Sequence, residues 1–474
     1  MLERLRQFPL SPGIAIVAVL AFVSSLSLLL IDSADPPGMD FWLFARPHHK
    51  SYLPVVAEWN ETRQNPEDRV NMLVIHEIPM ERRLISGFVA DTPVPDIAEV
   101  MTGMAGKFFA GPLEAVGFLD LTERLKEEGL MERINAPSFS PWMTRERVFG
   151  IPHDVHPVLL TYRADIVEAA GIDVSEIQTW DDFERVMAPL QKDEDGDGYP
   201  DRYVLNVGTS GSFVPELLMR QATGSLFLPD GRPQFATREH AEVAARIVTW
   251  LAGPNRMATL ARAFDASGNA MYLEGDVLTA FMPDWLAGVF TRDLAGLGGK
   301  MKVMPLPAFE PGGRRTSVLG GTMIGIPKDT ENPEAAWEFA KQLYTSKRVA
   351  EDLWNEARII SPIKAFWDDP MYAQPDPYFS GQPLGERFIE QAPHVPTRIS
   401  SPYSSMAMIE INAAIDRTVR WAETNDVWDR EALVPVVLEQ LEAGQAKVWR
   451  RMQQNVFLDL PDSLAHEEAQ APLP

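Results

Sequence analysis

The chain contains no cysteine, although it is 474 residues long. This absence excludes disulfide bonds, thiol-based catalysis and cysteine-ligated metal sites. Positive charge is also scarce, because 43 Lys and Arg residues are outnumbered by 67 Asp and Glu residues, which leaves a formal net charge of −24. A polyanion of this size repels nucleic acid and anionic membrane surfaces, so we expect no nucleic-acid partner.

Recognisable catalytic motifs are also missing from the sequence. It contains no G-x-S-x-G, no P-loop, no H-E-x-x-H and no Rossmann fingerprint. Residues 361–364 match the S-x-x-K pattern of penicillin-recognising enzymes, but neither Ser-Asp-Asn nor Lys-Thr-Gly follows them. A four-residue pattern often arises by chance, so we do not treat this match as a catalytic motif. Because no other catalytic motif is recognisable, we expect a protein that is not an enzyme.

The length of the chain favours two globular units, and its composition, 45% hydrophobic and 23% charged, is typical of a folded protein. Strand-like runs at 40–44, 71–75 and 96–100 alternate with helical patterns, which indicates α/β layering. Two helices are expected near the C-terminus, at 412–422 and 430–452.

The longest uncharged run lies near the N-terminus. Residues 13–31 contain no charged side chain, and a helix of this length rises roughly 28 Å, close to the hydrocarbon thickness of a bilayer. The run is either a cleaved signal peptide or a retained signal anchor, and the poor cleavage site at 32–34 favours the anchor. Arg4 and Arg6 precede the run, which places the N-terminus in the cytoplasm and the remaining chain outside.

Residues 193–201 form the sharpest local signal. Three aspartates occupy positions 1, 3 and 5 of a calcium-binding loop, and Gly198 occupies position 6, where such a loop turns sharply. Position 9 is also an aspartate, whereas position 12 is Val204 rather than an acid. The pattern predicts a structural Ca²⁺ site, and the alternative is a solvated acidic loop without an ion. The expected ligands are Asp193, Asp195, Asp197, Tyr199 and Asp201.

Two histidines lie close together at 153–156. Pro152 and Pro157 bracket them and argue against the helix that would place both rings on one face. Two interpretations stay open: a zinc site, and polar contacts from this segment to a small ligand.

The segment 318–347 combines a strand, a turn and a helix. Gly320 and Gly321 lie in the apolar run 319–326 and let the backbone approach another surface or a ligand. Residues 332–334, Asn-Pro-Glu, make a good helix start, with a capping side chain, a fixed φ and an acid in the first turn. Apolar residues then repeat at helical spacing.

This segment resembles the carbohydrate-binding group of extracellular solute-binding proteins from ABC importers, which carry a similar GG…NPEAAWEF pattern. Seven further segments match the family in the same order along the chain. They are 40–44, 52–60, 95–100, 118–121, 150–165, 179–183 and 280–285. Arg163 departs from the pattern, because the family usually has Asn there; we expect it to alter the neighbouring strand-to-helix turn.

The resemblance implies an α/β, two-lobed periplasmic-binding-protein fold of type II, with a ligand in a central cleft and closure by hinge motion. Lobe one would comprise 39–154 plus 303–345, and lobe two would comprise 155–302 plus 346–457. The flanking segments would be 1–38, with a cytoplasmic tip, the signal anchor and a linker, and a flexible tail at 458–474. Because the chain has no cysteine, it also lacks the lipid-modified cysteine that anchors many family members.

The resemblance also implies which residues line the cleft. Sugars present apolar C–H faces and a rim of hydroxyl groups, so a site needs aromatic rings and hydrogen-bonding groups. We expect Trp285 to stack on the ligand, and core packing is the alternative for each ring. The implied ligand-binding residues are Phe44, Arg46, Thr102, Asp154, His156, Trp285, Gly320, Gly321 and Tyr403.

The function implied by the resemblance is that of a membrane-tethered solute-binding protein on the periplasmic or extracellular face of the cell membrane. It would capture a sugar or oligosaccharide by cleft closure and deliver it to the permease subunits of an ABC importer. Two alternatives stay open. One is a ligand sensor or scaffold that signals through a membrane partner; the other is an anchored hydrolase, against which the lack of a recognisable nucleophile argues.

Overall fold

The computed structural model describes residues 12–30, 36–90, 92–208, 213–254, 256–261 and 266–458. The chain divides into two units, Met1–Gly38 and Met39–Pro474. In the first unit, α1 (Pro12–Leu30) is a helix of 19 residues whose sequence contains no charged residue. Across the described ranges, no helix combines the length and the apolar character needed to cross a membrane. The membrane helix expected at 13–31 is therefore not found there, and residue 31 and the cytoplasmic tip lie outside the described residues.

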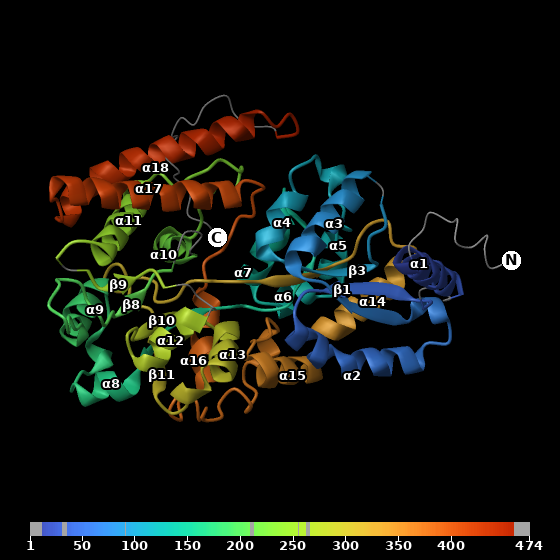
Figure 1. The fold of residues 1–474 in the computed structure, drawn as a ribbon, viewed down its shortest axis with the longest axis horizontal. Coiled ribbons are helices and arrows are strands. Elements are labelled where there is room, and N and C mark those ends of the chain that lie inside the picture. The colour runs from blue at the N-terminus through green and yellow to red at the C-terminus, as the bar shows by residue number, and fades with distance from the viewer. Residues whose placement is uncertain are drawn as a thin grey trace. The chain divides into compact units, whose positions relative to one another are not determined.

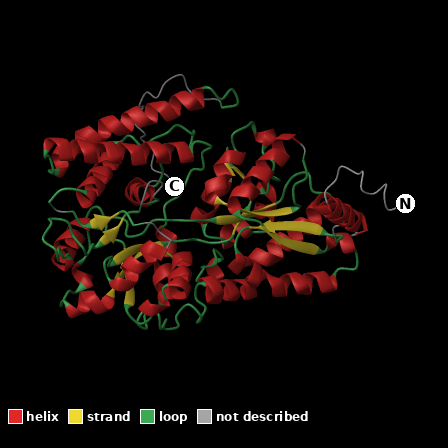
Figure 2. Ribbon diagram, in the orientation of Figure 1, coloured by secondary structure: helices red, strands yellow, loops and turns green. Residues whose placement is uncertain are grey.

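The second unit contains two main sheets, each with its own helices, and the part around the larger sheet is called lobe one below (Figure 1; Figure 2). This sheet has five strands in the order β2-β1-β3-β12-β6. They are β1 (Met39–Leu43), β2 (Val70–Val74), β3 (Ile97–Met101), β6 (Ile151–Pro152) and β12 (Thr322–Gly325). β1 pairs in parallel with β2 and β3, whereas β12 is antiparallel to β3 and β6. The three strands predicted in this part of the chain are confirmed to within one residue.

Helices cover both faces of the lobe-one sheet. They are α2 (Arg46–Thr62), α3 (Glu77–Ala90), α4 (Thr102–Phe108), α14 (Pro333–Tyr344) and α15 (Lys347–Ala357), with the short α5 (Thr122–Glu127), α6 (Leu130–Arg133) and α7 (Ala136–Phe139) and the hairpin β4 (Met143–Thr144)–β5 (Arg147–Val148). Side chains alternate along a strand, so Phe41 and Leu43 enter one core with Tyr52 of α2, while Trp42 enters the opposite core with Met80 of α3.

Lobe two is built on a three-stranded antiparallel sheet in the order β10-β7-β11. Its strands are β7 (Val158–Arg163), β10 (Thr279–Pro283) and β11 (Met301–Pro305), and a small parallel pair is formed by β8 (Leu205–Asn206) and β9 (Ala258–Thr259). Its helices are α8 (Ala164–Ala169), α9 (Trp180–Met187), α10 (Val214–Thr223), α11 (Arg238–Leu251), α12 (Ala266–Glu274), α13 (Asp284–Asp293), α16 (Leu384–Gln391), α17 (Ser404–Asn425) and α18 (Arg430–Gln453). Because β7 is buried on both faces, Val158 and Leu160 enter one core and Leu159 enters the other.

The two C-terminal helices run side by side and pack against α11 (Figure 1). Ile411 of α17 and Val448 of α18 lie in the same core as Val248 of α11. Both helices were predicted, and α17 begins at Ser404, before the first residue of the expected range 412–422. The tail from residue 459 lies outside the described residues.

Two of the expected lobe boundaries are wrong. The boundary at 303 falls inside β11, which pairs with β7 of lobe two, so lobe one resumes only at β12. Helix α15 was assigned to lobe two, but Val349 and Leu353 belong to the lobe-one core and the helix packs against α2. Helix α15 belongs to lobe one because its apolar face is buried in the lobe-one core.

The glycine-containing strand is also shorter than predicted. The sequence favoured a strand over 319–326, whereas β12 covers only Thr322–Gly325. Gly320 and Gly321 have φ values of 100° and 129°, so the backbone turns at them instead of extending. A Cβ on Gly320 would lie 2.8 Å from Nε1 of Trp285, so only glycine allows this approach.

The helix predicted after residue 332 is confirmed as α14, but its start differs in detail. Asn332 is the N-cap residue, yet its side chain makes no capping hydrogen bond. The side-chain amide nitrogen, Nδ2, donates instead to the backbone carbonyl of Glu67 at 3.4 Å. Pro333 at the first helical position and Glu334 in the first turn therefore define the start.

Candidate ligand-binding site

Three connecting segments meet between the two sheets. Residues 153–157 join β6 to β7, residues 306–321 join β11 to β12, and residues 392–403 join α16 to α17. The amide of Leu319 donates to the carbonyl of His156 at 3.4 Å, which ties the first two segments together. We call the side chains and glycine gathered at this point the hinge cluster: Asp154, His156, Asp284, Trp285, Gly320 and Arg398.

His156 lies at the centre of the hinge cluster. Its Nε2 lies 3.0 Å from Oδ2 of Asp154, and its Nδ1 contacts Oδ1 of Asp284. Both ring nitrogens face carboxylates, and only the doubly protonated imidazolium donates to both. The φ of His156 is 54°, in the left-handed region that non-glycine residues seldom adopt, so its surroundings hold this conformation.

The two carboxylates extend the cluster to other elements. Oδ2 of Asp154 accepts a hydrogen bond from the amide of Thr322 at 3.0 Å, at the start of β12. Oδ2 of Asp284 accepts one from the amide of Ile360 at 2.9 Å, just after α15. Asp284 is 0% exposed and Asp154 is 4% exposed, so these bonds are made away from solvent. The cluster thereby links lobe-one elements to the first turn of α13 in lobe two.

Electrostatics keep this cluster charged although it is buried. Burial by itself lowers the pKa of His156, but the Asp154 and Asp284 carboxylates outweigh it and raise this pKa to about 10. Burial likewise raises the pKa of Asp154, but His156 and His153 hold it well below its usual range. A proton held this firmly on His156 is unsuited to acid–base catalysis near neutral pH. The hydrogen bonds of the cluster instead hold the connecting segments in place.

Trp285 borders both lobes. Its ring is partly buried and packs against the lobe-one core and against a lobe-two core. Its Nε1 donates to the carbonyl of Leu319 at 3.0 Å. Thr102 approaches the same segment, because its Oγ1 donates to the carbonyl of Gly320 at 3.3 Å and its amide donates to Gly321 at 2.9 Å. Four expected site residues, Thr102, Trp285, Gly320 and Gly321, are thus neighbours.

Arg398 is a member of the hinge cluster that the sequence reasoning missed. Its Nη1 donates to the carbonyl of Gly320, and its backbone amide donates to Oγ of Ser140 at 2.9 Å. Burial, together with the charge of Arg220, lowers the pKa of Arg398 to about 9. Asp284 was missed as well. The only signal in the sequence was one charged residue between an apolar strand and Trp285.

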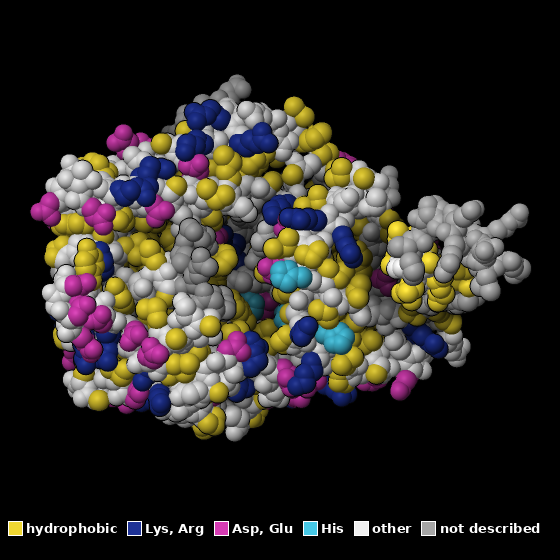
Figure 3. Space-filling view, in the orientation of Figure 1, with side chains coloured by type: hydrophobic (Ala, Val, Ile, Leu, Met, Phe, Trp, Pro, Cys, Tyr) yellow, Lys and Arg dark blue, Asp and Glu magenta, His cyan; other side chains and the backbone are white. Residues whose placement is uncertain are grey.

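Besides Thr102 and Gly321, which adjoin the hinge cluster, three expected site residues lie outside it. Phe44 packs against a lobe-one core, with its ring centroid 5.5 Å from that of His48, and Arg46 is exposed in the first turn of α2. Tyr403 lines a cavity of about 500 Å³ together with residues of α3, α4 and α18. The cavity therefore opens between lobe one and the last helix of lobe two, where Nδ2 of Asn455 donates to the carbonyl of Ala110 at 2.9 Å. Figure 3 shows a hollow between the two lobes with histidine side chains beside it.

The acidic loop, residues 193–201, lies between α9 and β8. The carboxylates of Asp193, Asp195 and Asp197 can each offer an oxygen within 4.8 Å of the other two, and all three are exposed. Asp201 is not in that group, and its Oδ2 accepts a hydrogen bond from the amide of Glu194 at 2.7 Å. Tyr199 is exposed, and the guanidinium of Arg256 lies 4.4 Å from its ring centroid.

Curated relatives extend over most of the chain. An arabinooligosaccharide-binding protein of Halalkalibacterium halodurans is 26% identical over 421 residues, which cover 87% of this chain and 89% of the relative. An arabinooligosaccharide-binding protein of Bacillus subtilis is 24% identical over 318 residues, which cover 67% of this chain and 71% of the relative.

Solved structures share the fold. The sugar-binding protein MalE of Xanthomonas citri superposes with a TM-score of 0.69 at 17% identity, covering 88% of this chain and 99% of that one. A binding protein of Bifidobacterium animalis subsp. lactis, solved with β-1,6-galactobiose, has a TM-score of 0.65 at 17% identity, covering 90% of this chain and 99% of that one. These likenesses establish the two-lobed α/β architecture that the sequence led us to expect.

Membership of a family follows from a match to most of the folded region. The model of the bacterial extracellular solute-binding proteins matches residues 79–349, which run from α3 in lobe one through lobe two and back to α15. The hinge cluster lies within this span except for Arg398. The chain belongs to the family of bacterial extracellular solute-binding proteins.

Proposed function

We propose that this chain binds a sugar or oligosaccharide between its two lobes and presents it to the permease subunits of an ABC importer. The observation that carries the proposal is the position of Trp285, whose partly buried ring borders the cores of both lobes beside Gly320. An aromatic face next to polar groups suits a ligand with apolar C–H faces and hydroxyl groups. The names of the two curated relatives support the choice of ligand class.

Cleft closure is the mechanism that we infer for ligand capture. The segments 153–157 and 306–321, which join strands of different lobes, are points about which one lobe would rotate against the other. Ligand contacts made from both lobes favour the closed state, and the binding free energy supplies the difference. The chain itself would carry out no covalent chemistry.

Thermal unfolding with candidate ligands tests this proposal. The full-length chain would be heated with arabino-oligosaccharides, β-1,6-galactobiose and maltose, and with a polyamine as the control ligand. A sugar at about 100 times its dissociation constant should stabilise the native state by about 2.7 kcal/mol. Stabilisation by the polyamine, with none by a broad set of sugars, would contradict the carbohydrate assignment.

A structural calcium site in the acidic loop is a separate proposal. Three exposed carboxylates whose oxygens come within 4.8 Å of one another repel each other, and a hard divalent cation prefers such oxygen ligands. The loop backbone holds them in place, because the amides of Gly196 and Gly198 donate to Asp193 at 2.8 and 3.0 Å. Its expected role is stability alone.

We further propose that the N-terminal segment tethers the protein to the outer face of the cell membrane. The uncharged sequence of α1 and the arginines before it support this orientation. A tethered protein should stay in the membrane fraction through a high-salt wash and keep its N-terminus, as measured by intact mass. A mature N-terminus near residue 34 in a soluble fraction would show cleavage instead.

A further inference from the structure

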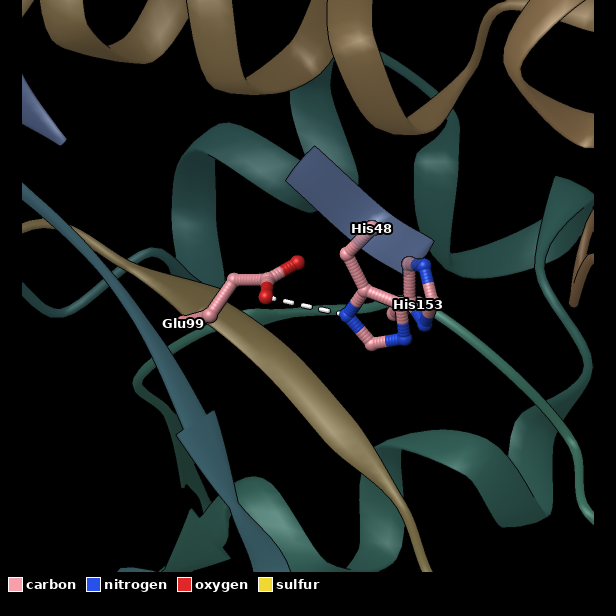
Figure 4. Close-up of side chains that lie close together, drawn as sticks. All are labelled: His48, Glu99 and His153. Carbon is pink, nitrogen blue, oxygen red and sulfur yellow. Dashed lines mark hydrogen bonds and ion pairs between the residues drawn. The ribbon is translucent and has the colours of Figure 1, made fainter. Parts of the chain in front are cut away.

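A second group of buried titratable side chains lies in lobe one, next to the hinge cluster, where His153 contacts Asp154. His48 comes from the first turn of α2, Glu99 from the middle of β3, and His153 directly follows β6 (Figure 4). One potential ligand atom from each lies within 4.8 Å of the other two. The three residues are 5%, 0% and 3% exposed, so solvent does not satisfy them.

His153 leaves one ring nitrogen without a partner. Its Nδ1 lies 3.1 Å from Oδ2 of Asp154 and donates to it, while its Nε2 is buried with no hydrogen-bond partner. Because Nδ1 donates to a carboxylate, the neutral tautomer of this ring carries its lone pair on Nε2, the nitrogen that has no partner. An unpartnered polar atom in the interior is costly, so this nitrogen calls for an explanation.

Glu99 is held so that one of its oxygens is oriented toward the histidines. Its Oε1 accepts hydrogen bonds from the hydroxyl groups of Tyr52 at 2.6 Å and Tyr344 at 2.9 Å. Its Oε2 lies 3.0 Å from Nδ1 of His48 (Figure 4). Both aromatic residues belong to helices that pack on this face of the sheet, and the carboxylate is therefore fixed by its surroundings before any further partner arrives.

A simple ion pair explains only part of this arrangement. The contact between Nδ1 of His48 and Oε2 of Glu99 pairs these two side chains, but it leaves Nε2 of His153 without a partner. His156 is not available to complete a metal site with His153, because its two nitrogens contact Asp154 and Asp284. The zinc site considered for the two histidines of 153–156 is therefore not formed by that pair.

We propose that His48, Glu99 and His153 bind one divalent transition-metal ion of the zinc type. Two imidazole nitrogens and one carboxylate oxygen are a ligand set that such ions favour. Asp154 on Nδ1 of His153 and the tyrosines on Oε1 of Glu99 act as the partners that orient metal ligands. A bound ion would join α2, β3 and the 153–157 segment, and so would brace lobe one where the chain crosses to lobe two.

Zinc content is the direct test. The full-length chain, prepared without a polyhistidine tag, would be refolded with zinc sulfate, dialysed and assayed by elemental mass spectrometry. His48→Asn and His153→Asn keep an amide donor near each Nδ1 position and remove the ligand nitrogens. His49→Asn, next to His48 but outside the group, is the matched control. One zinc per chain in the wild type and in His49→Asn, lost in the other two, is the expected result.

A variant outside the ligand set keeps the test decisive if the histidine variants do not fold. Tyr344→Phe removes one hydroxyl group from Glu99 and should weaken zinc affinity roughly 10–100-fold. Cobalt bound to the wild type should also give visible absorption bands typical of nitrogen and oxygen ligands. Wild-type protein that retains no zinc and shows no cobalt bands would overturn the proposal. So would zinc retained equally by His48→Asn, His153→Asn and Tyr344→Phe.

Discussion

The hinge cluster and the acidic loop both gather carboxylates, yet they satisfy them in opposite ways. In the hinge cluster, Asp284 is 0% exposed and contacts a charged imidazole that comes from another part of the chain. In the acidic loop, Asp195 and Asp197 are exposed, and each accepts a hydrogen bond from an amide two residues further along the loop. The first group depends on partners distant in sequence, and the second depends on water and its own backbone.

This difference determines what each group can contribute. A buried charge is tolerated only with a partner, so removing one member of the hinge cluster leaves another charge stranded. An exposed carboxylate is already solvated, and its removal changes little unless an ion is bound. The two groups should therefore respond very differently to the same substitution.

The largest effect is expected for Asp284→Ala. It leaves His156⁺ with a single carboxylate and the amide of Ile360 without its acceptor, and should lower the free energy of unfolding by about 3–5 kcal/mol. Asp197→Ala in the acidic loop, measured without calcium, is the matched control and should stay within about 0.5 kcal/mol of the wild type. Urea unfolding of both variants gives the comparison, and equal losses would refute it.

Trp285→Ala should reduce ligand affinity by about 2–4 kcal/mol, because it removes an aromatic face from the border of the two lobes. Trp180→Ala is the control, since Trp180 is fully buried in lobe two and its loss should cost about 3–5 kcal/mol of stability instead. Calorimetry with the ligand found by the thermal screen measures the first quantity, and urea unfolding measures the second. Unchanged affinity of Trp285→Ala with a large loss of stability would make it a packing residue.

The hinge cluster should also make stability depend on pH. The pKa of His156 is about 10 in the native state and lies near 6.5 when the chain is unfolded, so the native state binds the proton more tightly. The stabilisation is complete below pH ~6.5 and is lost as the pH rises toward 10, on the order of 1 kcal/mol per pH unit. Unfolding curves from pH 6 to 10 should show this decline in the wild type and a weaker one in His156→Gln.

The smallest effect is expected at the acidic loop. Calcium at about ten times its dissociation constant should stabilise the protein by on the order of 1 kcal/mol. Asp195→Ala combined with Asp197→Ala should remove this response while ligand affinity stays unchanged. Calorimetry that detects no calcium binding at millimolar concentration would leave the loop as a solvated acidic turn.

Features made by neighbours in sequence could be predicted. The strands of lobe one, α14 after residue 332 and the convergence of Asp193, Asp195 and Asp197 all follow from local spacing. Local spacing does not fix every detail. It predicts a capping hydrogen bond from the side chain of Asn332, whereas this side chain donates to the carbonyl of Glu67. The extent of β12 was also overestimated, since the sequence permits Gly320 and Gly321 to be either extended or turned.

Contacts between distant residues could not be predicted from spacing, and only the family resemblance grouped Thr102, Trp285 and Gly320, which are neighbours in the structure. Asp284 lies 128 residues from His156, and Glu99 lies 51 residues from His48. No spacing rule connects such pairs, because the sheet order and the crossovers bring them together. One signal was available in hindsight: Glu99 is a charged residue inside the otherwise apolar run Ile97–Met101, and a buried strand position of this kind demands partners.

The repeated crossing of the chain between the lobes has a consequence for synthesis. The core of lobe one is complete once Ile363 has been made, whereas the core of lobe two also needs Met452 at the end of α18. Roughly 90 residues separate these two points, which is on the order of 5 to 20 s of translation. During that interval, the apolar side of α11 lacks the helices that cover it. Lobe one can therefore bury its core while lobe two still lacks the helix that completes its own.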